Sequence, residues 1–534
     1  MHFVFFSTWQ NHAGKSLEFI EKYINEVVLP LYANTHTESS LTGLQTSHFR
    51  KQARNAIETA FNAPNENYAV IFTGSGVTAS IDKFSRMVGI DQRNLNFNSE
   101  RTKTNPIVFI GPYEHHSNEV YWRESCAKLV KIQPDPQTGS IDHEDLETQL
   151  QKYASHNLKI GSFSAASNVT GIRSDTKVLS QILHKYGALA CFDFASAGPH
   201  CVVNIEKDDI DVAFFSVHKF VGGPQTPGIL IMRRTIFEEY AKHRPPTIPG
   251  GGTVSFVLPE AGQVYHDNVE EREEGGTPAI VESIRAGLVL TIHKEMGGKI
   301  EEVEGKYSSQ ALKCWGSNPN LLILGNIDTK RVPIISFLVK DPFGGEKFVH
   351  YELVTVLLND LFGIQARGGC VCASPYGHLL MNIDQAKSNK IKEAFHSHGN
   401  IMKAGWTRVA FSYYMEQETV DYIIKAVTIV AEESANLLPW YKINSNGSWS
   451  YVGITGKTKN DSIIDLWDFK NMGKKYKKPE KIRIKDLDKS MKQAKKIIKA
   501  LGNTTPSPSI TQTSRNILAE KERWFLTPEE INKT

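Results

Sequence analysis

The feature that most restricts the fold of this chain is an alternation of short apolar runs with helix-like segments between about residues 68 and 290. Runs such as Tyr68–Phe72 and Leu189–Phe192 are apolar throughout, which is typical of strands buried on both faces of a parallel sheet. The segment Ala79–Val88, which follows one such run, has the character of a helix. Strands that alternate with helices predict an α/β fold built on a doubly wound, mostly parallel sheet.

The length of 534 residues leaves room for more than this sheet. A strand-like run at Pro333–Val339 and a closing helix near Thr419–Leu437 predict a second, smaller α/β domain. We divide the chain into an N-terminal helix and cleft-mouth segment at 1–50, a large domain at 51–295, a small domain at 296–437 and a lysine-rich, partly flexible extension at 438–534.

The extension is marked by its charge. Lysines are dense in Lys474–Lys478 and again between Lys481 and Lys499, and a run of threonine, serine and proline follows at Thr504–Ser509. This composition predicts a solvated helix and a flexible linker. Contact of the lysines with an anionic membrane or with RNA is the alternative interpretation.

Composition argues against several classes of protein. A net charge of +3 gives no global case for nucleic-acid binding, and no uninterrupted apolar run approaches the ~20 residues that span a bilayer. Met1–Ser7 is apolar but lacks the basic and long apolar regions of a signal peptide. The six cysteines show no disulfide-like spacing, and we therefore expect a cytoplasmic protein in a reducing compartment.

A lysine and an aspartate that follow two of the apolar runs predict a specific cofactor. Asp193 follows Leu189–Phe192 and Lys219 closely follows Val212–Phe215, 26 residues later, an interval that allows the chain to return to the same cleft. Pyridoxal phosphate requires a lysine amine for a Schiff base and an acid facing its pyridine nitrogen. The acid keeps the ring protonated, so the ring withdraws electrons from the α-carbon of the substrate. Lys219 and Asp193 are the predicted pair.

The neighbouring residues form a series of motifs. Ser216–Lys219, followed by the turn Gly222–Pro224, resembles the cofactor-lysine motif of class V aminotransferases and cysteine desulfurases, and is similar to that of selenocysteine lyases and molybdenum cofactor sulfurases. Seven further segments fit this family in order: Thr73–Thr78, Glu114–Asn118, Ser167–Gly171, Asp193–Ser196, Gly275–Pro278, Arg367–Cys372 and Arg408–Ser412. The resemblance covers about residues 17–437. It implies the pyridoxal-phosphate fold type I and a homodimer.

The resemblance also implies roles around the cofactor ring. His115 would stack on the pyridine ring, Asn168 would bond the phenolic oxygen and Asp193 would pair with the ring nitrogen. Ser196 stands where desulfurases usually carry glutamine, near the same oxygen. Its shorter side chain is a departure from the family pattern.

The phosphate of the cofactor is expected at a strand-to-helix turn, where glycine allows close approach and the first helical N–H groups are unpaired. The predicted ligands at this turn are Gly76, Val77 and Thr78. The resemblance implies that Ser216 and His218, beside the lysine, also hold the phosphate, and that Thr277 reaches it across a dimer interface.

The cysteines bear on the reaction. Only Cys370 and Cys372 form a close motif, and Arg367–Cys372 fits the Arg-x-Gly-x-x-Cys loop that carries the sulfur-accepting thiol in some desulfurases. The resemblance implies that Cys372, assisted by Arg367, attacks the sulfur of cofactor-bound cysteine and leaves a persulfide and alanine. Inert thiols, a redox pair or half of a metal site are alternatives. No second Cys or His pair at zinc-like spacing occurs, so we predict no metal.

Three residues are predicted to contact an amino-acid substrate. Arg408 heads the alternating run Arg408–Tyr414, and its guanidinium suits an α-carboxylate because it offers two parallel hydrogen bonds. An arginine that ends an edge strand in a salt bridge is the alternative. Arg367, and Asn34 in the loop Tyr32–Thr37, are the other two.

These motifs predict a pyridoxal-phosphate-dependent, cysteine desulfurase-like sulfurtransferase that acts on L-cysteine and passes sulfur to a protein acceptor. An aminotransferase or β-eliminating lyase without persulfide chemistry is one alternative, and a non-catalytic scaffold is another. Two departures from the family favour the scaffold: Phe3–Gly14 lacks the strand and alanine turn with which the family opens, and Ser196 replaces the usual glutamine. The retained Lys219 and Asp193 argue against it.

Overall fold

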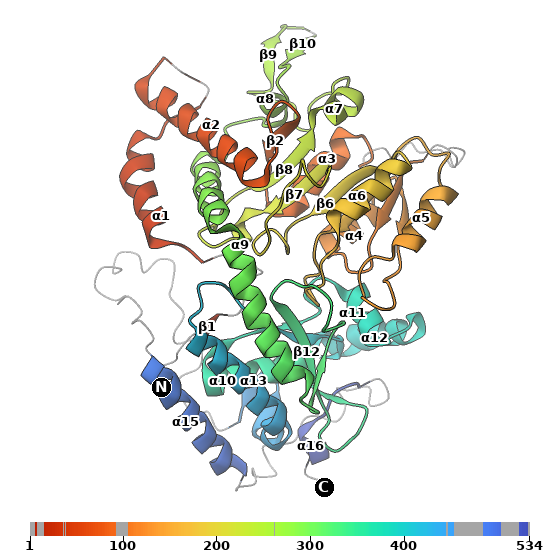
Figure 1. Ribbon diagram of the computed structural model, residues 1–534, viewed down its shortest axis with the longest axis vertical. Coiled ribbons are helices and arrows are strands. Elements are labelled where there is room, and N and C mark those ends of the chain that lie inside the picture. The colour runs from red at the N-terminus through yellow and green to blue at the C-terminus, as the bar shows by residue number, and fades with distance from the viewer. Residues whose placement is uncertain are drawn as a thin grey trace.

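The computed structural model describes residues 6–7, 15–35, 37, 39–91, 105–260, 262–444, 447–452, 484–502 and 523–531. Two α/β halves lie one above the other in Figure 1 and are joined by the long helix α9 (Ile280–Gly316). Helical geometry is interrupted inside α9 at Gly297, where φ is 37° and ψ is −125°. No helix of the described ranges is long and apolar enough to cross a membrane.

The upper half contains a seven-stranded sheet in the order β2-β8-β7-β6-β5-β3-β4. Every neighbouring pair is parallel except the two that involve β8, so the predicted mostly parallel sheet is confirmed. The strands are β2 (Tyr68–Phe72), β3 (Ile107–Ile110), β4 (Lys128–Lys131), β5 (Lys159–Ser164), β6 (Leu189–Asp193), β7 (Val212–Ser216) and β8 (Gly228–Arg233).

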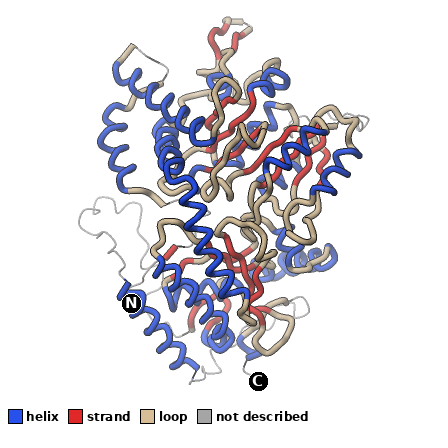
Figure 2. The backbone as a smooth tube through the Cα atoms, in the orientation of Figure 1, coloured by secondary structure: helices blue, strands red, loops and turns tan. Residues whose placement is uncertain are grey.

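Helices cover both faces of this sheet (Figure 2). Alternate strand residues enter two separate cores, because successive side chains of a strand point to opposite faces: Val70 and Phe72 enter one core, and Ala69 and Ile71 the other. The first core includes side chains of α2 (Leu41–Phe61), α5 (His143–Lys152), α6 (Thr176–Lys185) and the beginning of α9, and the second those of α3 (Gly76–Met87) and α4 (His116–Arg123).

The lower half contains an antiparallel sheet in the order β11-β12-β16-β15, with β13 also paired to β12. Its strands are β11 (Leu321–Ile323), β12 (Ile334–Lys340), β13 (Phe348–Val349), β15 (Arg367–Gly369) and β16 (Trp406–Ala410). The helices α10 (Tyr351–Phe362) and α13 (Gln417–Leu437) and the end of α9 share a third core with it. Both the strand predicted near 333–339 and the closing helix are present.

Shorter elements complete the described chain. At the N-terminal end these are β1 (Phe6–Ser7), paired in parallel with β14 (Ile364–Gln365), then α1 (Glu18–Tyr23), the π-helical turn η1 (Ile24–Val28) and the 3-10 turn η2 (Leu29–Leu31). Further along are η3 (Val217–Lys219), α7 (Arg234–Ile236), η4 (Phe237–Ala241), the projecting hairpin β9 (Val254–Val257) and β10 (Gln263–Tyr265), α8 (Val269–Glu273), α11 (Ser374–Leu380), α12 (Gln385–His398), η5 (Gly399–Met402) and η6 (Leu438–Trp440).

Two of the three predicted domain limits fall inside helices, whereas the limit after residue 437 coincides with the end of α13. The limit after residue 50 falls inside α2, which packs against α9 as part of the upper half. The limit after residue 295 falls inside α9, two residues before the interruption at Gly297. Of the segment Phe3–Gly14, the structure describes only Phe6–Ser7.

The described part of the extension corrects the expectation of a fully solvated helix. Helix α15 (Ile484–Gly502) buries Leu487, Met491, Ala494 and Ile498 in the core of the lower half, and it packs against α13. These four residues recur at helical spacing and form one apolar face of the helix. The many lysines between them obscure this pattern in the sequence. Its exposed residues include Lys485, Lys489, Lys492, Lys495, Lys496 and Lys499.

Three more extension elements lie in the same half: the hairpin β17 (Tyr441–Ile443) and β18 (Trp449–Tyr451), and α16 (Pro528–Ile531). Lys474–Lys478 and Thr504–Ser509 lie outside the described residues.

Replacing Leu487 with alanine tests this packing. We expect Leu487→Ala to lower the free energy of unfolding by about 2–5 kcal/mol, the range for a leucine truncated in a core. Lys492→Ala, on the exposed side of the same helix, should change it by less than about 0.5 kcal/mol. Urea titration of both variants measures the difference, and equal effects would contradict a packed α15.

Candidate active site

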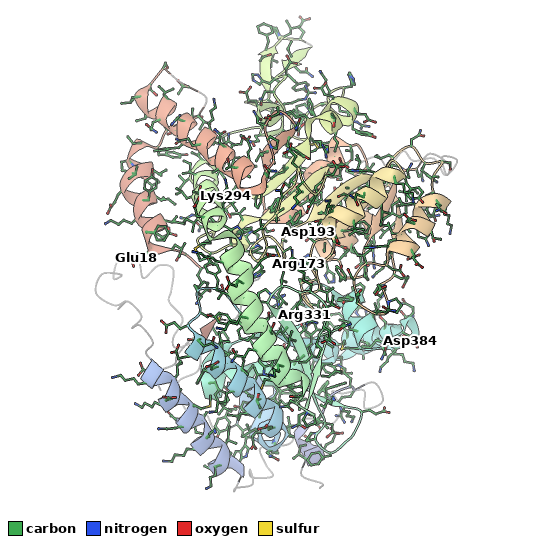
Figure 3. All side chains as sticks on the ribbon, viewed as in Figure 1. Glu18, Arg173, Asp193, Lys294, Arg331 and Asp384 are labelled. Atoms are coloured by element: carbon green, nitrogen blue, oxygen red, sulfur yellow. The ribbon has the colours of Figure 1, made fainter. Side chains whose placement is uncertain are left out.

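The site lies at the carboxyl ends of β6 and β7. These strands are parallel neighbours, so Asp193 at the end of β6 and the turn η3 after β7 meet at one edge of the larger sheet. In Figure 3, Asp193 lies above Arg173 of the upper half and Arg331 of the lower half. The two halves meet at this point, where Ile172 forms an antiparallel β-bridge with Arg331. A cavity of about 190 Å³ opens at this edge. The predicted residues that line it are Val77, Thr78, His115, Asn168, Asp193, Ser196, Ser216, His218 and Lys219.

One wall of the cavity is a helix N-terminus. Strand β2 ends at Phe72 and α3 begins at Gly76, and Ser75 at the N-cap makes no side-chain cap bond. Gly76 has φ of 59°, and a Cβ there would lie 2.6 Å from Ser216 Oγ and 2.7 Å from His218 Cε1. Only glycine fits this position, and the chain can therefore bring the first helical N–H groups close to an anion.

Hydroxyl groups surround the same helix end. Ser216 Oγ accepts a hydrogen bond from Val77 N at 3.0 Å, and Thr78 Oγ1 lies 2.7 Å from Ser117 Oγ. Burial lowers the pKa of His218 to about 4, with Lys219 adding to the effect. The wall therefore combines neutral donors with a helix dipole, which suits a phosphate group.

His115 lines the cavity as the N-cap residue of α4. Its Nδ1 accepts a hydrogen bond from Ser117 N at 3.1 Å, so the proton of the neutral ring is on Nε2. Burial lowers the pKa of His115 to about 3, and the charge of Lys219 adds to this effect. The imidazole is therefore neutral, and its Nε2–H group can donate a hydrogen bond to a ligand.

Lys219 and Asp193 both line the cavity, Asp193 as a buried residue and Lys219 as a partly exposed one. Burial lowers the pKa of Lys219 to about 8, although the Asp193 carboxylate opposes the shift. Burial likewise raises the pKa of Asp193, and Lys219 opposes that shift. The Oδ1 atom of Asp193 accepts a hydrogen bond from Ala195 N at 2.7 Å, which fixes the carboxylate at the end of β6.

Arg408 comes from the smaller sheet. It lies in the middle of β16, not at the head of a strand, and β16 is bordered on both sides by β12 and β15. The alternative of an arginine that ends an edge strand is therefore wrong. Its side chain is buried and donates a hydrogen bond from Nη1 to Asn168 O at 2.7 Å. Burial lowers the pKa of Arg408 to about 9, and its register partner Arg367 adds to this effect.

The thiol loop, Cys370–Ala373, follows β15 and lies against the larger half. His116 N donates to Cys372 O at 2.8 Å, and Asn168 Nδ2 donates to Val371 O at 2.7 Å. Val371 and Cys372 have φ of 42° and 60°, a region that costs non-glycine residues roughly 1–3 kcal/mol each. The bonds from His116 and Asn168 hold this strained loop beside the cavity.

Six predicted residues are not part of the lining of this cavity: Asn34, Gly76, Thr277, Arg367, Cys372 and Arg408. Asn34 and Thr277 are both exposed. The loop of Thr277 starts at Glu274, whose carboxylate is contacted by Arg50, by Arg54 at 3.0 Å and by the N–H of Phe72 at 2.7 Å.

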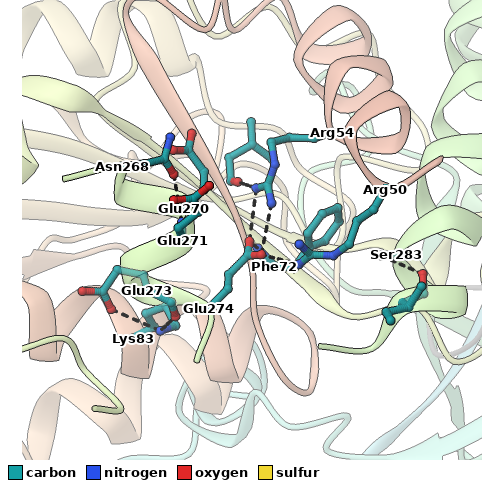
Figure 4. A network of polar contacts seen from close by, with 12 residues as sticks. Arg50, Arg54, Phe72, Lys83, Asn268, Glu270, Glu271, Glu273, Glu274 and Ser283 are labelled. Carbon is teal, nitrogen blue, oxygen red and sulfur yellow. Dashed lines mark hydrogen bonds and ion pairs between the residues drawn. The ribbon is translucent and has the colours of Figure 1, made fainter. Parts of the chain in front are cut away.

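The preceding residue, Glu273, pairs with Lys83 of α3 at 3.3 Å (Figure 4). These buried ion pairs fix the start of the Thr277 loop on α2, α3 and the larger sheet, while Thr277 itself remains exposed.

Some residues of the site were given no role in the sequence analysis. Glu114 is buried and accepts hydrogen bonds from Ser164 N at 3.0 Å, Ser164 Oγ at 2.6 Å and Asn118 Nδ2 at 2.7 Å. Burial raises the pKa of Glu114 to about 7, against the effect of these bonds. Glu114 anchors the segment that carries His115. In the sequence, its position directly before His115 could have indicated this role. Ser75, Ser117, Ser164, Ala166 and Ala195 also line the cavity.

A family model described as aminotransferase class-V matches residues 15–423. A probable cysteine desulfurase of Halalkalibacterium halodurans is 28% identical over 351 residues, which are 64% of this chain and 78% of that protein. A cysteine desulfurase of Escherichia coli is 27% identical over 291 residues, 54% of this chain and 67% of that protein.

Solved structures share the fold. The apo structure of cysteine desulfurase from Thermococcus onnurineus has a TM-score of 0.65 at 22% identity, and the alignment covers 80% of this chain and 95% of that one. A cysteine desulfurase from Escherichia coli has a TM-score of 0.62 at 21% identity, with 80% and 94% covered.

The lowered pKa of Lys219 predicts the pH dependence of its reactivity. In the cofactor-free protein the amine reacts only when neutral, so its acetylation should rise with pH and reach half of its maximum near pH 8. Asp193→Asn removes the carboxylate that favours the charged amine, and the midpoint should move to lower pH. Competitive acetylation with mass spectrometry measures both, with the exposed Lys485 as internal reference. A midpoint near the ordinary lysine value of about 10.4 would contradict this assignment.

Proposed function

Because the chain belongs to the class V aminotransferase family, we propose that it is a pyridoxal-phosphate-dependent enzyme that transfers the sulfur of L-cysteine to its own Cys372 and releases alanine. The observation that carries this proposal is the position of the thiol loop, which two hydrogen bonds hold beside the cavity that Lys219 lines. The names of the relatives, cysteine desulfurases, support the choice of substrate.

The residues of the cavity fit pyridoxal phosphate. The α3 N-terminus with Gly76 and Ser216 is a place for its phosphate, and Asp193 is an acid for its ring nitrogen. The Oδ1 atom of Asn168 is buried in this lining without a hydrogen-bond partner among the described residues, and a polar ligand would supply one. When bound, the cofactor draws electron density from the substrate and so weakens the bonds around its α-carbon.

Side chains of the protein would bind the substrate and transfer protons. Arg408, fixed by Asn168, is placed to hold the α-carboxylate with two parallel hydrogen bonds. Lys219 is able to take up and return a proton at Nζ near neutral pH, because burial has lowered its pKa to about 8. The neutral ring of His115 keeps a flat face and an Nε2–H donor in the cavity.

The sulfur step is a transfer between thiols. Cys372 Sγ forms a bond to the sulfur of the substrate while the bond from that sulfur to the substrate Cβ breaks. The carbon takes up a proton, so cysteine and a protein thiol become alanine and a protein persulfide. No external oxidant enters this balance, and the persulfide can pass to a protein acceptor.

The two cysteines of the loop face different surroundings. The carbonyl of Cys372 accepts a hydrogen bond from His116 N, next to the cavity residue His115, whereas Cys370 directly follows the edge strand β15. This difference supports Cys372 as the nucleophile.

We expect the wild-type protein to release sulfide and alanine from L-cysteine in the presence of a reductant. Cys372→Ser should abolish sulfide release and still bind the cofactor, whereas the matched Cys370→Ser should keep substantial activity. Mass spectrometry after a single turnover locates the added sulfur.

An added sulfur on Cys370 in Cys372→Ser would reverse the assignment. No added sulfur on either thiol, with transamination or elimination still measurable, would favour the aminotransferase or lyase alternative. Loss of the cofactor's visible absorbance in Lys219→Ala would be consistent with its attachment there.

We also propose that the active form is a homodimer in which Thr277 completes the phosphate site of the partner subunit. Apolar side chains are exposed on the hairpin β9–β10, among them Phe256 at 61% and Val264 at 58%. An exposed apolar patch of this kind supports a protein contact. The anchored loop of Thr277 lies in the same stretch of chain, and Thr277 is exposed and is not part of the lining of its own cavity.

Mixed dimers test this arrangement. Lys219→Ala and Thr277→Asp should each be inactive alone, the second because its carboxylate repels phosphate. After the two proteins are unfolded and refolded together, about a quarter of wild-type activity should return, since half of the dimers then hold one complete site. No recovery, or a fully active monomer by sedimentation, would contradict the proposal.

A cytoplasmic location and a protein sulfur acceptor remain part of this proposal, as does contact of Asn34 with the substrate at the mouth of the cavity. Asn34 lies between η2 and α2, where the chain is exposed.

A further inference from the structure

A short segment near the C-terminal end of the chain, residues 523–531, packs into the lower half. We call it the C-terminal strap. Phe348 N donates to Trp524 O at 3.1 Å and Leu526 N donates to Phe348 O at 2.9 Å, so the strap pairs in parallel beside β13. Phe525 is fully buried, and Arg523 pairs with Glu530 at 2.7 Å within the strap. This segment lies 100 residues beyond the end of the family match at residue 423.

The strap places Trp524 in an aromatic cluster at the N-terminus of α10. The indole stacks on Tyr351 with ring centroids 6.0 Å apart and an interplanar angle of 12°, and on His350 at 5.4 Å and 28°. Its Nε1 donates to Met402 O at 3.3 Å. The cluster also contains Trp449 of β18, which contacts His350 at 5.8 Å and donates to its Nδ1 at 3.2 Å.

Tyr351 also packs against the strand that leads into the thiol loop. A Cβ at Gly368 would lie 2.8 Å from Tyr351 Cδ2, and one at Gly405 would lie 2.6 Å from Tyr351 Cε1. Glycine is required at both positions because the ring occupies the space that a side chain would need. Tyr351 O also accepts a hydrogen bond from Thr407 Oγ1 at 3.3 Å, which ties it to β16.

The strand β15 is paired with a neighbouring strand on one side only. β15 is the edge of the smaller sheet and contains three residues, Arg367–Gly369, paired with β16. The thiol loop continues directly from it and carries the strained Val371 and Cys372. At its far end the loop is held by His116 and Asn168 of the larger half, and at its near end Gly368 packs against the ring of Tyr351 and, at a longer distance, the methyl group of Thr355.

We infer that the C-terminal strap positions the thiol loop for sulfur transfer: Trp524 holds the ring of Tyr351 against Gly368, and this contact sets where Cys372 stands. Trp524 is a positioning residue, because it touches neither the cavity nor the thiol itself. The identity of the reaction rests on the function proposed above, whereas the effect on the thiol does not.

Removal of the flat ring at residue 524 is the direct test, in the full chain carrying its cofactor. Trp524→Leu should lower kcat for sulfide release by about tenfold, the factor that one well-packed aromatic pair supports, and should change KM for cysteine by less than about twofold. KM should stay near its wild-type value because the substitution does not change Arg408 or Lys219. Alkylation of Cys372 by iodoacetamide, read on its peptide by mass spectrometry, should become at least about threefold faster, because the loop is less confined. Trp524→Phe should restore both values.

Trp449→Leu is the matched control. Trp449 is buried in the same cluster and contacts His350, so its loss disturbs the packing of the lower half, but no contact with Tyr351 is found for it among the described residues. We expect Trp449→Leu to lower the melting temperature at least as much as Trp524→Leu and to leave the alkylation rate of Cys372 near that of the wild type. If either leucine variant fails to fold, methionine at the same two positions makes the same comparison.

Two results would overturn the inference: an unchanged alkylation rate in folded Trp524→Leu, or an equal change in Trp449→Leu. If wild-type protein releases no sulfide from cysteine, the proposed function fails, and the alkylation contrast still decides whether the strap positions Cys372.

Discussion

Lys219 and Asp193 line one cavity at the carboxyl edge of a parallel sheet, and each acts electrostatically on the other; the rest of the site is arranged around them. Burial disfavours both charges, and each partly offsets the shift of the other. Such a pair persists only on a rigid frame, which the apolar strands β6 and β7 provide because both of their faces are covered by cores. The lysine that results is a base near neutral pH and not a permanently charged surface group.

The second half of the molecule brings the groups that would act on a substrate, and Asn168 joins the two halves. Its carbonyl accepts a hydrogen bond from Arg408, and its side-chain nitrogen donates to Val371 of the thiol loop. A single residue of the larger half thus fixes both the arginine and the loop that comes from the smaller sheet. This arrangement couples the position of the thiol to the cavity without any covalent link between them.

The extension is part of the architecture of the lower half. α15 buries one face on α13, and the strap pairs beside β13 and stacks on the first residue of α10. Chain beyond the family match therefore supports the strand that leads to Cys370 and Cys372. A small sheet with a three-residue edge strand has few contacts of its own to hold a strained loop, and added aromatic packing supplies them.

The sequence determined the parallel sheet and most of the cavity, because unbroken apolar runs have one stable environment and because the residues around Lys219 form local motifs. Strand ends carry Asp193 and Ser216, so their meeting followed from the order of the strands. Only the tertiary structure decided how Glu114 is buried, how the thiol loop is held by His116 and Asn168, and where α15 and the strap pack. Those features depend on contacts between segments up to hundreds of residues apart, and a long-range contact such as that of Trp524 with Tyr351 leaves no periodic pattern in either segment.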